Sequence, residues 1–419
     1  MFKIRRGFFK EALTVPNIES IFYRFLKIHT SFMIFTTLPN IFISTFLMAQ
    51  SGSMNVVLYF NAIYYFGTAA GMFVAIPVLR KFGSGLISLV GILLYCLLYL
   101  LLIVFNTNSA SYVILLACIY GMGGAFYWLS YSYRVTEYST LENRDSALAV
   151  ISMFASVVNL SAPLISGIMI SVVGGTFGYM IVFALSLAIA VLTAIGSVRL
   201  PEQKKKKTKV MYREALQCFR QYRCMRFCMY SEACKGVRDG AFGFILNIIL
   251  YKFVSNEALI GFNTFLSGAA SIISFIIMNR IVRGNNRVKY MKISAVSLFL
   301  FSVCTIFTLN PLILILFSII NSFFSGFIVN SSSSTFFDAL QVVPGSREKR
   351  PELMMIKEFF LSSGRCSGLL FIVLIDSLTG GDTVWQAVSL TVLSAAQFGT
   401  VALSKRANAL NRETQESAV

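Results

Sequence analysis

Charged residues are scarce in this chain of 419 residues: only 13% are Asp, Glu, Lys or Arg, whereas 56% are hydrophobic. A soluble protein keeps roughly a quarter of its residues charged. The chain has one histidine, and its eight cysteines show no paired spacing, so we expect free thiols, no metal site and no cofactor. The low charge and a mean hydropathy of +0.73 indicate an integral membrane protein.

Two further absences narrow the function. No Gly-Lys-Ser or Gly-Lys-Thr phosphate-binding loop is present, which argues against a nucleotide-driven pump. No selectivity element recurs along the chain, which argues against a channel.

The N-terminal stretch "MFKIRRGFFKEALTVPNIESIFYRF" has neither a continuous apolar core nor a small-residue cleavage site. We therefore expect a basic interfacial segment over 1–28 and no cleaved signal peptide.

The basic residues show a pattern along the chain. There are 36 Lys and Arg against 18 Asp and Glu, a formal net charge of +18, and most basic residues lie between the apolar runs. Connections rich in Lys and Arg alternate with connections such as "AQSGSMN", "NTNSAS" and "LTGGDT", which contain none. The positive-inside rule explains this charge without nucleic-acid binding and predicts that both termini are cytoplasmic.

The apolar runs number twelve, each near the roughly 20 residues that a membrane span needs. They cover 29–49, 56–79, 85–105, 111–133, 147–171, 176–198, 227–252, 258–280, 288–308, 311–335, 357–377 and 384–404. We predict an all-α integral membrane protein with 12 transmembrane helices in two six-helix bundles, at 29–198 and 227–404. A basic cytoplasmic loop at 199–226 joins the bundles, and a cytoplasmic tail at 405–419 follows them.

Part of the central loop, "MYREALQCFRQYRCMRF", predicts a basic amphipathic helix on the inner leaflet. Because Lys and Arg there are attracted by anionic lipid, membrane lipids are expected partners.

The seventh span contains four charges in the stretch "YSEACKGVRDGAFG", namely Glu232, Lys235, Arg238 and Asp239. A charge at the centre of a span costs about 2.5–3.5 kcal/mol on insertion scales. These side chains must therefore be paired, face a watery cavity, or both. Glu232, Lys235 and Asp239 share one stripe of the helix, so we expect Lys235 to contact both acids.

The eleventh span offers complementary charges. Glu358 and Arg365 lie on one of its faces, and we expect Arg365 to form a salt bridge with an acid on the seventh span. Gly236, Gly240 and Gly243 flank the charged stripe and predict a close helix approach. A network that only holds the helices together is the alternative to a role in solute or proton handling.

The first bundle contributes aromatic and amide side chains. Trp128 and Tyr131 lie in the fourth span, Asn40 in the first and Asn159 in the fifth. Aromatic rings with amides suit an organic, partly apolar solute, although Trp128 could equally anchor its span at the interface. His29, at the start of the first predicted span, is expected at the membrane interface and not as a proton carrier.

A weak repeat relates the two halves. Aligning Arg144 with Arg350 brings Asn159 over Arg365, both in the middle of a predicted helix. Corresponding positions in the two halves are typical of transporters built from repeated bundles.

Short motifs carry a resemblance to a known family. The turn after the second span reads "GMFVAIPVLRKFGSG", where Gly71, Arg80, Lys81, Phe82 and Gly83 fit the outline of a Gly- and Arg-rich signature. "NLSAPLISG" in the fifth span looks like a degraded Gly-Pro motif. With six plus six spans, the chain resembles the major facilitator superfamily over nearly its whole length. In that family's signature an Asp stands where this chain has Arg80.

The resemblance implies a secondary transporter in which two bundles rock around a midplane site. It places Arg80, Lys81, Gly83 and Arg144 in gating loops. The candidates for binding the solute or a coupling ion are Glu232, Lys235, Arg238, Asp239, Arg365, Glu358, Asn159, Trp128, Tyr131 and Asn40.

The leading hypothesis is a multi-pass secondary active transporter, not an enzyme, in a bacterial cytoplasmic membrane. It would move a small organic solute by alternating access as a monomer, with an anionic or amphiphilic solute and proton coupling through Asp239 as finer hypotheses. One alternative is a flippase-like transporter of a lipid-linked molecule. Another is a membrane enzyme acting on a lipid-linked substrate, which would use the acids of "YSTLENRD" or Asp338.

Overall fold

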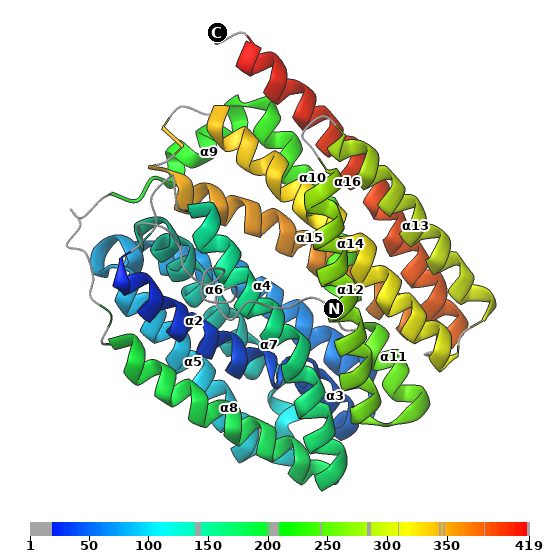
Figure 1. The fold of residues 1–419 in the computed structure, drawn as a ribbon. Helices are drawn as coiled ribbons and strands as arrows, with labels where there is room; N and C mark the ends of the chain where they lie inside the picture. Colours follow the sequence, from blue (N-terminus) through cyan, green and yellow to red (C-terminus); the bar gives the residue numbers. More distant parts are fainter. Residues whose placement is uncertain are drawn as a thin grey trace, which may run out of the picture.

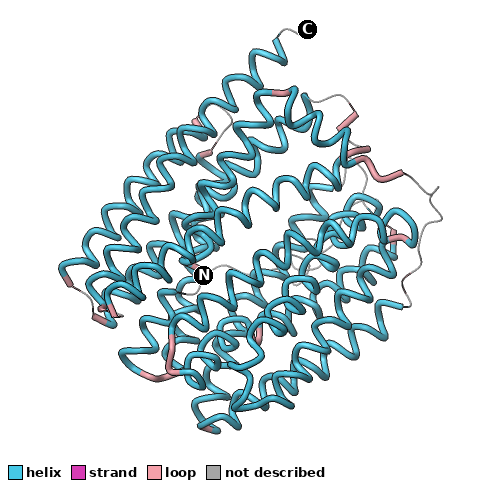
Figure 2. The backbone as a smooth tube through the Cα atoms, turned by 180° about the vertical axis from the view of Figure 1, so that it is seen from behind, coloured by secondary structure: helices cyan, strands magenta, loops and turns pink. Residues whose placement is uncertain are grey.

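The computed structural model describes residues 19–138, 144–198, 200, 209–243, 245–282, 286–308, 310–342, 345–346, 348–380 and 382–416. Within these residues every regular element is a helix, as Figure 2 shows. Most of the expected N-terminal interfacial segment falls on 1–18, and the acidic stretch "STLEN" falls on 139–143; both lie outside the described residues.

The helices fall into two groups that follow the halves of the chain (Figure 1). The first half contains α2 (Ser20–Thr37), α3 (Asn40–Ser51), α4 (Met54–Phe82), α5 (Ser84–Phe105), the 3-10 helix η1 (Asn106–Tyr112), α6 (Val113–Tyr138), α7 (Arg144–Val173) and α8 (Gly175–Val198). The second contains α9 (Tyr212–Gln221), α10 (Arg223–Phe242), α11 (Ile245–Val254), α12 (Glu257–Ile281), α13 (Arg287–Phe307), α14 (Pro311–Val342), α15 (Arg350–Thr379) and α16 (Thr383–Glu416).

These elements make up the twelve predicted spans. In the described residues, ten stretches are long and apolar enough to cross a membrane, and the 52-residue stretch Ser84–Val135 contains two spans, α5 and α6. The remaining span, the seventh along the chain, is α10 with α11, and the charged residues of α10 exclude it from these ten stretches. The predicted fold is confirmed.

The first span of each half is broken near its middle. The first span breaks between α2 and α3 at Pro39, which has no N–H to continue the helical ladder. The seventh breaks between α10, which ends at Phe242 with Gly243 as its C-cap, and α11. Helices α7 and α15 also correspond, because each has 30 residues and they begin at Arg144 and Arg350. The backbone therefore supports the predicted alignment of these two residues.

The two halves meet mainly where α4 packs on α15 and α7 packs on α12. The second contact depends on glycine. A methyl group added to Gly167 of α7 would lie 2.6 Å from the carbonyl oxygen of Glu257, and one added to Gly261 of α12 would lie 2.6 Å from that of Pro163. The "NLSAPLISG" segment thus supplies a small residue where α7 packs closely on α12 of the other half.

Two sequence expectations need correction. His29 is not interfacial: its side chain is 3% exposed, because α2 begins at Ser20 and places it inside the first bundle. Its Nδ1 lies 3.1 Å from the hydroxyl of Tyr127. The predicted amphipathic helix is confirmed over Tyr212–Gln221, but it ends at Gln221, short of the expected end at Phe227. Its apolar face, including Ala215 and Cys218, packs against the second half.

Candidate functional site

Small residues bring α10 and α15 together along the charged region. Methyl groups added to Gly236, Gly364 or Gly368 would overlap carbonyl oxygens of the facing helix. One added to Gly240 would lie 2.6 Å from the Cα of Arg365. The predicted role of Gly243 is wrong, because a methyl group there would meet only its own helix. Backbone contact at four glycines fixes where the neighbouring charged side chains can point.

Glu232 and Lys235 of α10 form a buried cluster with side chains of α14 and α15. Lys235 donates to Glu232 Oε2 at 2.5 Å, and both side chains are 4% exposed or less. Ser332 of α14 donates to Glu232 Oε1 at 2.9 Å and accepts from Lys235 at 3.1 Å. Lys357 of α15 lies 4.0 Å from Glu232. The predicted Glu232–Lys235 pair is confirmed, and its polar atoms are occupied by protein partners.

Arg238 and Asp239 form a second pair. Arg238 is 1% exposed, donates to the side-chain oxygen of Asn321 on α14, and lies 3.7 Å from Asp239. Its guanidinium carbon stands 4.3 Å from the ring centre of Phe242. The predicted contact of Lys235 with Asp239 is wrong, because Lys235 turns toward Glu232 and Ser332.

Arg365 takes a partner from its own helix. It donates to Glu358 at 3.1 Å, and its guanidinium lies 4.8 Å from the ring centre of Tyr65 on α4. The predicted salt bridge from Arg365 to an acid of the seventh span is wrong. Because the α15 backbone at Arg365 touches Gly240 directly, the side chain leaves sideways, toward Glu358 and Tyr65. The ion pair that does join α10 and α15 is Glu232 with Lys357.

Exposure divides these charges into two sets. Glu232, Lys235 and Arg238 have side chains at most 4% exposed. The side chains of the other four, Asp239, Lys357, Glu358 and Arg365, are 18–24% exposed. Only this second set offers surface to a solute. The Nε atoms of Arg238 and Arg365 are both buried and have no hydrogen-bond partner among the described residues.

Tyrosine side chains connect Arg365 to the first half. Tyr65 donates to the carbonyl of Gly240 at 3.4 Å. Its ring contacts Tyr64 at 4.9 Å, and Tyr64 stacks on Tyr120 at 4.4 Å. Tyr120 in turn donates to the side chain of Asn40 at 3.2 Å. Asn40, a predicted site residue, therefore lies at the far end of a series of contacts that begins at Arg365.

The other predicted residues of the first half lie further from Arg365. Asn159 is exposed and accepts from Thr37 at 3.4 Å. Trp128 is 37% exposed and contacts Tyr131 edge to face at 5.3 Å. Both rings belong to the aromatic group around His29, which reaches Tyr120 through Phe32 and Tyr95.

Sequence reasoning missed Lys357 and Tyr65. The signal for Lys357 was its position next to Glu358 at the head of the eleventh span. The signal for Tyr65 was the Tyr-Tyr pair in the middle of the second span.

Within the described part of the chain, no group of three or more His, Cys, Asp or Glu could hold a metal ion. Asp338, considered for an enzyme, pairs with Arg287 at 2.9 Å.

A separate ion pair joins the halves near the end of α4. Arg80 contacts both carboxylate oxygens of Glu352 on α15, at 2.8 and 2.9 Å, and Glu352 has no exposed surface. Arg80 also donates to the carbonyl of Glu348 at 2.8 Å. Glu352 accepts the N–H of Met211, just before α9, at 3.3 Å. Position 80, where the family's signature has an Asp, therefore contributes the cation of an ion pair whose acid lies on the opposite half.

The other predicted gating residues are less constrained. Lys81 is exposed and lies over the ring of Phe82, while Gly83 has φ +89°, which a glycine adopts without strain. Arg144 is described only through its backbone, as the first residue of α7.

At the end of the helices opposite to the Arg80 pair, a second contact joins the halves: Tyr179 of α8 donates to Glu257 of α12 at 2.9 Å.

Sequence comparison identifies related proteins. The model of the Major Facilitator Superfamily matches residues 25–402. The uncharacterized protein YqgE of Bacillus subtilis (strain 168) is 22% identical over 356 residues, 85% of this chain and 82% of that protein. An uncharacterized protein in the sodM 3' region of Geobacillus stearothermophilus is 22% identical over 188 residues, 45% of this chain and 86% of that protein.

Solved structures show the same fold at low sequence identity. The nucleoside transporter NupG has a TM-score of 0.68 at 12% identity, covering 94% of this chain and 99% of that one. The E. coli fucose:proton symporter FucP gives 0.63 at 12%, covering 94% and 98%. A bacterial homologue of the iron transporter ferroportin gives 0.65 at 13%, covering 95% and 100%. With the family match over residues 25–402, these findings establish that the chain belongs to the Major Facilitator Superfamily and is a secondary transporter of the membrane, not an enzyme.

Proposed function

We propose that the transported solute is a small organic anion, with a carboxylate or phosphate group, and that it binds between the halves at Arg365. The observation that carries this proposal is the state of that side chain. It is 24% exposed, uses one oxygen of Glu358, and keeps a buried Nε without a partner among the described residues. A guanidinium with spare donors is the protein group best suited to bind a carboxylate or phosphate.

The charge balance around Arg365 supports an anion. The cluster on α10 and α15 holds four basic side chains and three acidic ones, counting Lys357 and excluding the Arg80 pair. A solute with one negative charge would neutralise this excess. Tyr64, Tyr65 and Tyr120 line the first-half side and would contact the organic part of the solute.

We propose Glu358 as the carboxylate that couples transport to protons. An anion that binds Arg365 competes with Glu358 for the same guanidinium. A carboxylate that loses a cationic partner in a low-dielectric site becomes easier to protonate. Solute and proton would then bind together. Asp239, the coupling residue expected from the sequence, contacts Arg238 and not Arg365, so the geometry favours Glu358.

We propose that the moving bodies are the bundles 29–198 and 227–404, joined by 199–226 and followed by the tail at 405–419. Arg80–Glu352 and Tyr179–Glu257 would close opposite ends of the path between them. These contacts join the halves at the two ends of the helices, where alternating access requires bonds that form in one state and break in the other. A monomer in a bacterial cytoplasmic membrane fits the bacterial relatives.

A binding panel tests the solute class. Purified protein is titrated by thermal shift with monocarboxylates, phosphate esters, zwitterionic amino acids, sugars and nucleosides. We expect an anionic class to bind, with affinity falling about tenfold or more in Arg365→Gln, since a charged hydrogen bond contributes about 1.5–3 kcal/mol. Arg24→Gln, an exposed charge on α2, is the matched control and should bind like the parent. If the tightest ligand is neutral and Arg365→Gln binds it unchanged, the proposal is wrong.

A second experiment separates the two carboxylates. In proteoliposomes with an imposed pH gradient, Glu358→Gln should lose accumulation of the anion but retain exchange between the two sides. Asp239→Asn should retain both. The reverse pattern would assign coupling to Asp239, and unchanged accumulation in both variants would exclude proton coupling at this cluster.

A further inference from the structure

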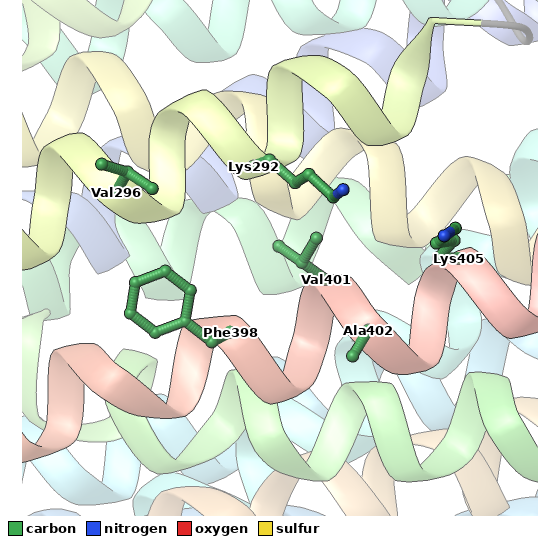
Figure 3. A pocket seen from close by; sticks show the side chains of 6 residues that line it. All are labelled: Lys292, Val296, Phe398, Val401, Ala402 and Lys405. Carbon is green, nitrogen blue, oxygen red and sulfur yellow. The ribbon is translucent and has the colours of Figure 1, made fainter.

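A groove of about 430 Å³ lies between α13 and α16, outside the site described above (Figure 3). Lys292 and Val296 of α13 and Phe398, Val401, Ala402 and Lys405 of α16 line it. No acidic residue is among the six. In Figure 3 Lys292 of α13 and Val401 and Phe398 of α16 point into the space between the two helices, with the amino group of Lys292 above Val401.

The groove faces away from the contact between the halves. Helices α13 and α16 lie at the edge of the second half that is farthest from α2 to α8 (Figure 1). Nearby α13 side chains such as Ile293 and Leu300 are 46% and 58% exposed. An apolar, exposed surface on a membrane-spanning bundle faces lipid, so the groove opens into the bilayer and not into the solute path.

The basic and apolar residues of the groove lie at different depths in the bilayer. Lys292 lies just after the start of α13 at Arg287, and Lys405 lies in the part of α16 that leads to the C-terminus. Both ends are cytoplasmic by the positive-inside rule. At 1.5 Å per residue, Val296 lies about 6 Å deeper than Lys292, and Phe398 about 10 Å deeper than Lys405. Basic groups therefore stand at headgroup depth, and apolar groups at the depth of acyl chains.

We propose that this groove is a binding site for an anionic phospholipid of the inner leaflet. The phosphate lies between Lys292 and Lys405, and one acyl chain follows Val296, Val401 and Phe398. Charge complementarity selects this occupant, because exposed lysines near the inner leaflet attract headgroups with a net negative charge, whereas the ammonium group of a zwitterionic lipid offsets the attraction of its phosphate. The site does not depend on the identity of the transported solute.

Native mass spectrometry of the full chain in detergent tests the site with phosphatidylglycerol and phosphatidylcholine. The parent should retain phosphatidylglycerol more tightly than phosphatidylcholine. The double variant Lys292→Gln/Lys405→Gln should bind phosphatidylglycerol about thirtyfold more weakly, about 2 kcal/mol at 1.4 kcal/mol per tenfold. Ala402→Phe, which fills the groove at an exposed position, should weaken both lipids.

The matched control is Arg24→Gln/Lys27→Gln, which removes two exposed charges from α2 in the other half and should leave lipid binding unchanged. Inorganic phosphate is added in a parallel titration and should not displace the lipid. Equal retention of phosphatidylglycerol by the parent and the lysine double variant would overturn the proposal. So would equal retention of both lipids by the parent. Displacement of the lipid by phosphate, with phosphate binding intact in Ala402→Phe, would assign the lysines to a free anion.

Discussion

Replacing Glu352 with glutamine tests how strongly its ion pair with Arg80 holds the two halves together. The carboxylate is fully buried and receives three guanidinium contacts at 2.8, 2.9 and 3.2 Å, while the Arg80 side chain is 13% exposed. Glutamine has nearly the same shape and keeps one oxygen acceptor. The substitution therefore removes charge while changing little in packing.

The expected loss follows from the geometry. Two unit charges 2.8 Å apart attract by about 6 kcal/mol at an effective dielectric constant of 20, and desolvation offsets much of this. Removing one partner of a buried pair typically costs about 3–5 kcal/mol. Because glutamine still accepts from Arg80 and from the N–H of Met211, we expect Glu352→Gln to lower the free energy of unfolding by about 2–3 kcal/mol.

A double-mutant cycle provides the assay. Arg80→Gln, Glu352→Gln and the combined variant are unfolded in mixed micelles by denaturing detergent, and the coupling energy should be about 2 kcal/mol. The charge swap Arg80→Glu/Glu352→Arg should not restore stability. A carboxylate at position 80 would face the carbonyl of Glu348, and an arginine at 352 could not accept the N–H of Met211. A coupling energy below about 0.5 kcal/mol, or full rescue by the swap, would refute the reasoning.

Three other expectations follow from the fold. Gly364→Ala should reduce the free energy of unfolding by about 1–3 kcal/mol, because its methyl group overlaps a backbone carbonyl of α10; parent stability would show that the helices can separate at no cost. Tyr179→Phe loses the 2.9 Å hydrogen bond to the glutamate that begins α12. In detergent unfolding it should lower stability by about 1.5–3 kcal/mol, and no change would mean that water replaces the hydroxyl. With native cysteines replaced by serine, Lys209→Cys should resist an impermeant thiol reagent added to intact cells, whereas Thr107→Cys should react. The reverse result would invert the topology.

The spans were predictable because hydrophobic length and loop charge depend on composition and not on tertiary detail. The limits of this reasoning appear at the first span, which was expected from residue 29. Before that residue, Arg24 and Lys27 lie exposed on one side of α2, while Phe22, Phe25 and Leu26 are buried. The helix is amphipathic there. A hydropathy average combines its exposed charged residues with its buried apolar ones, and so does not reveal the earlier start of the helix.

The sequence shows which charged residues lie in the seventh and eleventh spans, but it predicts less well which residues they contact. Spacing on one helix correctly paired Glu232 with Lys235, since three residues apart is a local relation. The direction of Arg365 depends on a non-local fact, the contact of its backbone with Gly240. Lys357 is the first residue of the predicted span 357–377, whereas α15 begins at Arg350 and places Lys357 seven residues inside the helix. Such contacts require the relative positions of α10, α15 and α4.

The central claim is that Arg365 binds the solute that this protein moves, and counterflow tests it most directly. Proteoliposomes are loaded with the anion that binds most tightly in the panel, diluted into labelled anion, and followed for transient uptake by the parent, Arg365→Gln and Arg24→Gln. We predict uptake by the parent and by Arg24→Gln, and at least a tenfold lower initial rate at subsaturating anion in correctly folded Arg365→Gln, consistent with the loss of about 1.5–3 kcal/mol of binding. Uptake by Arg365→Gln at the parent's rate would contradict the claim.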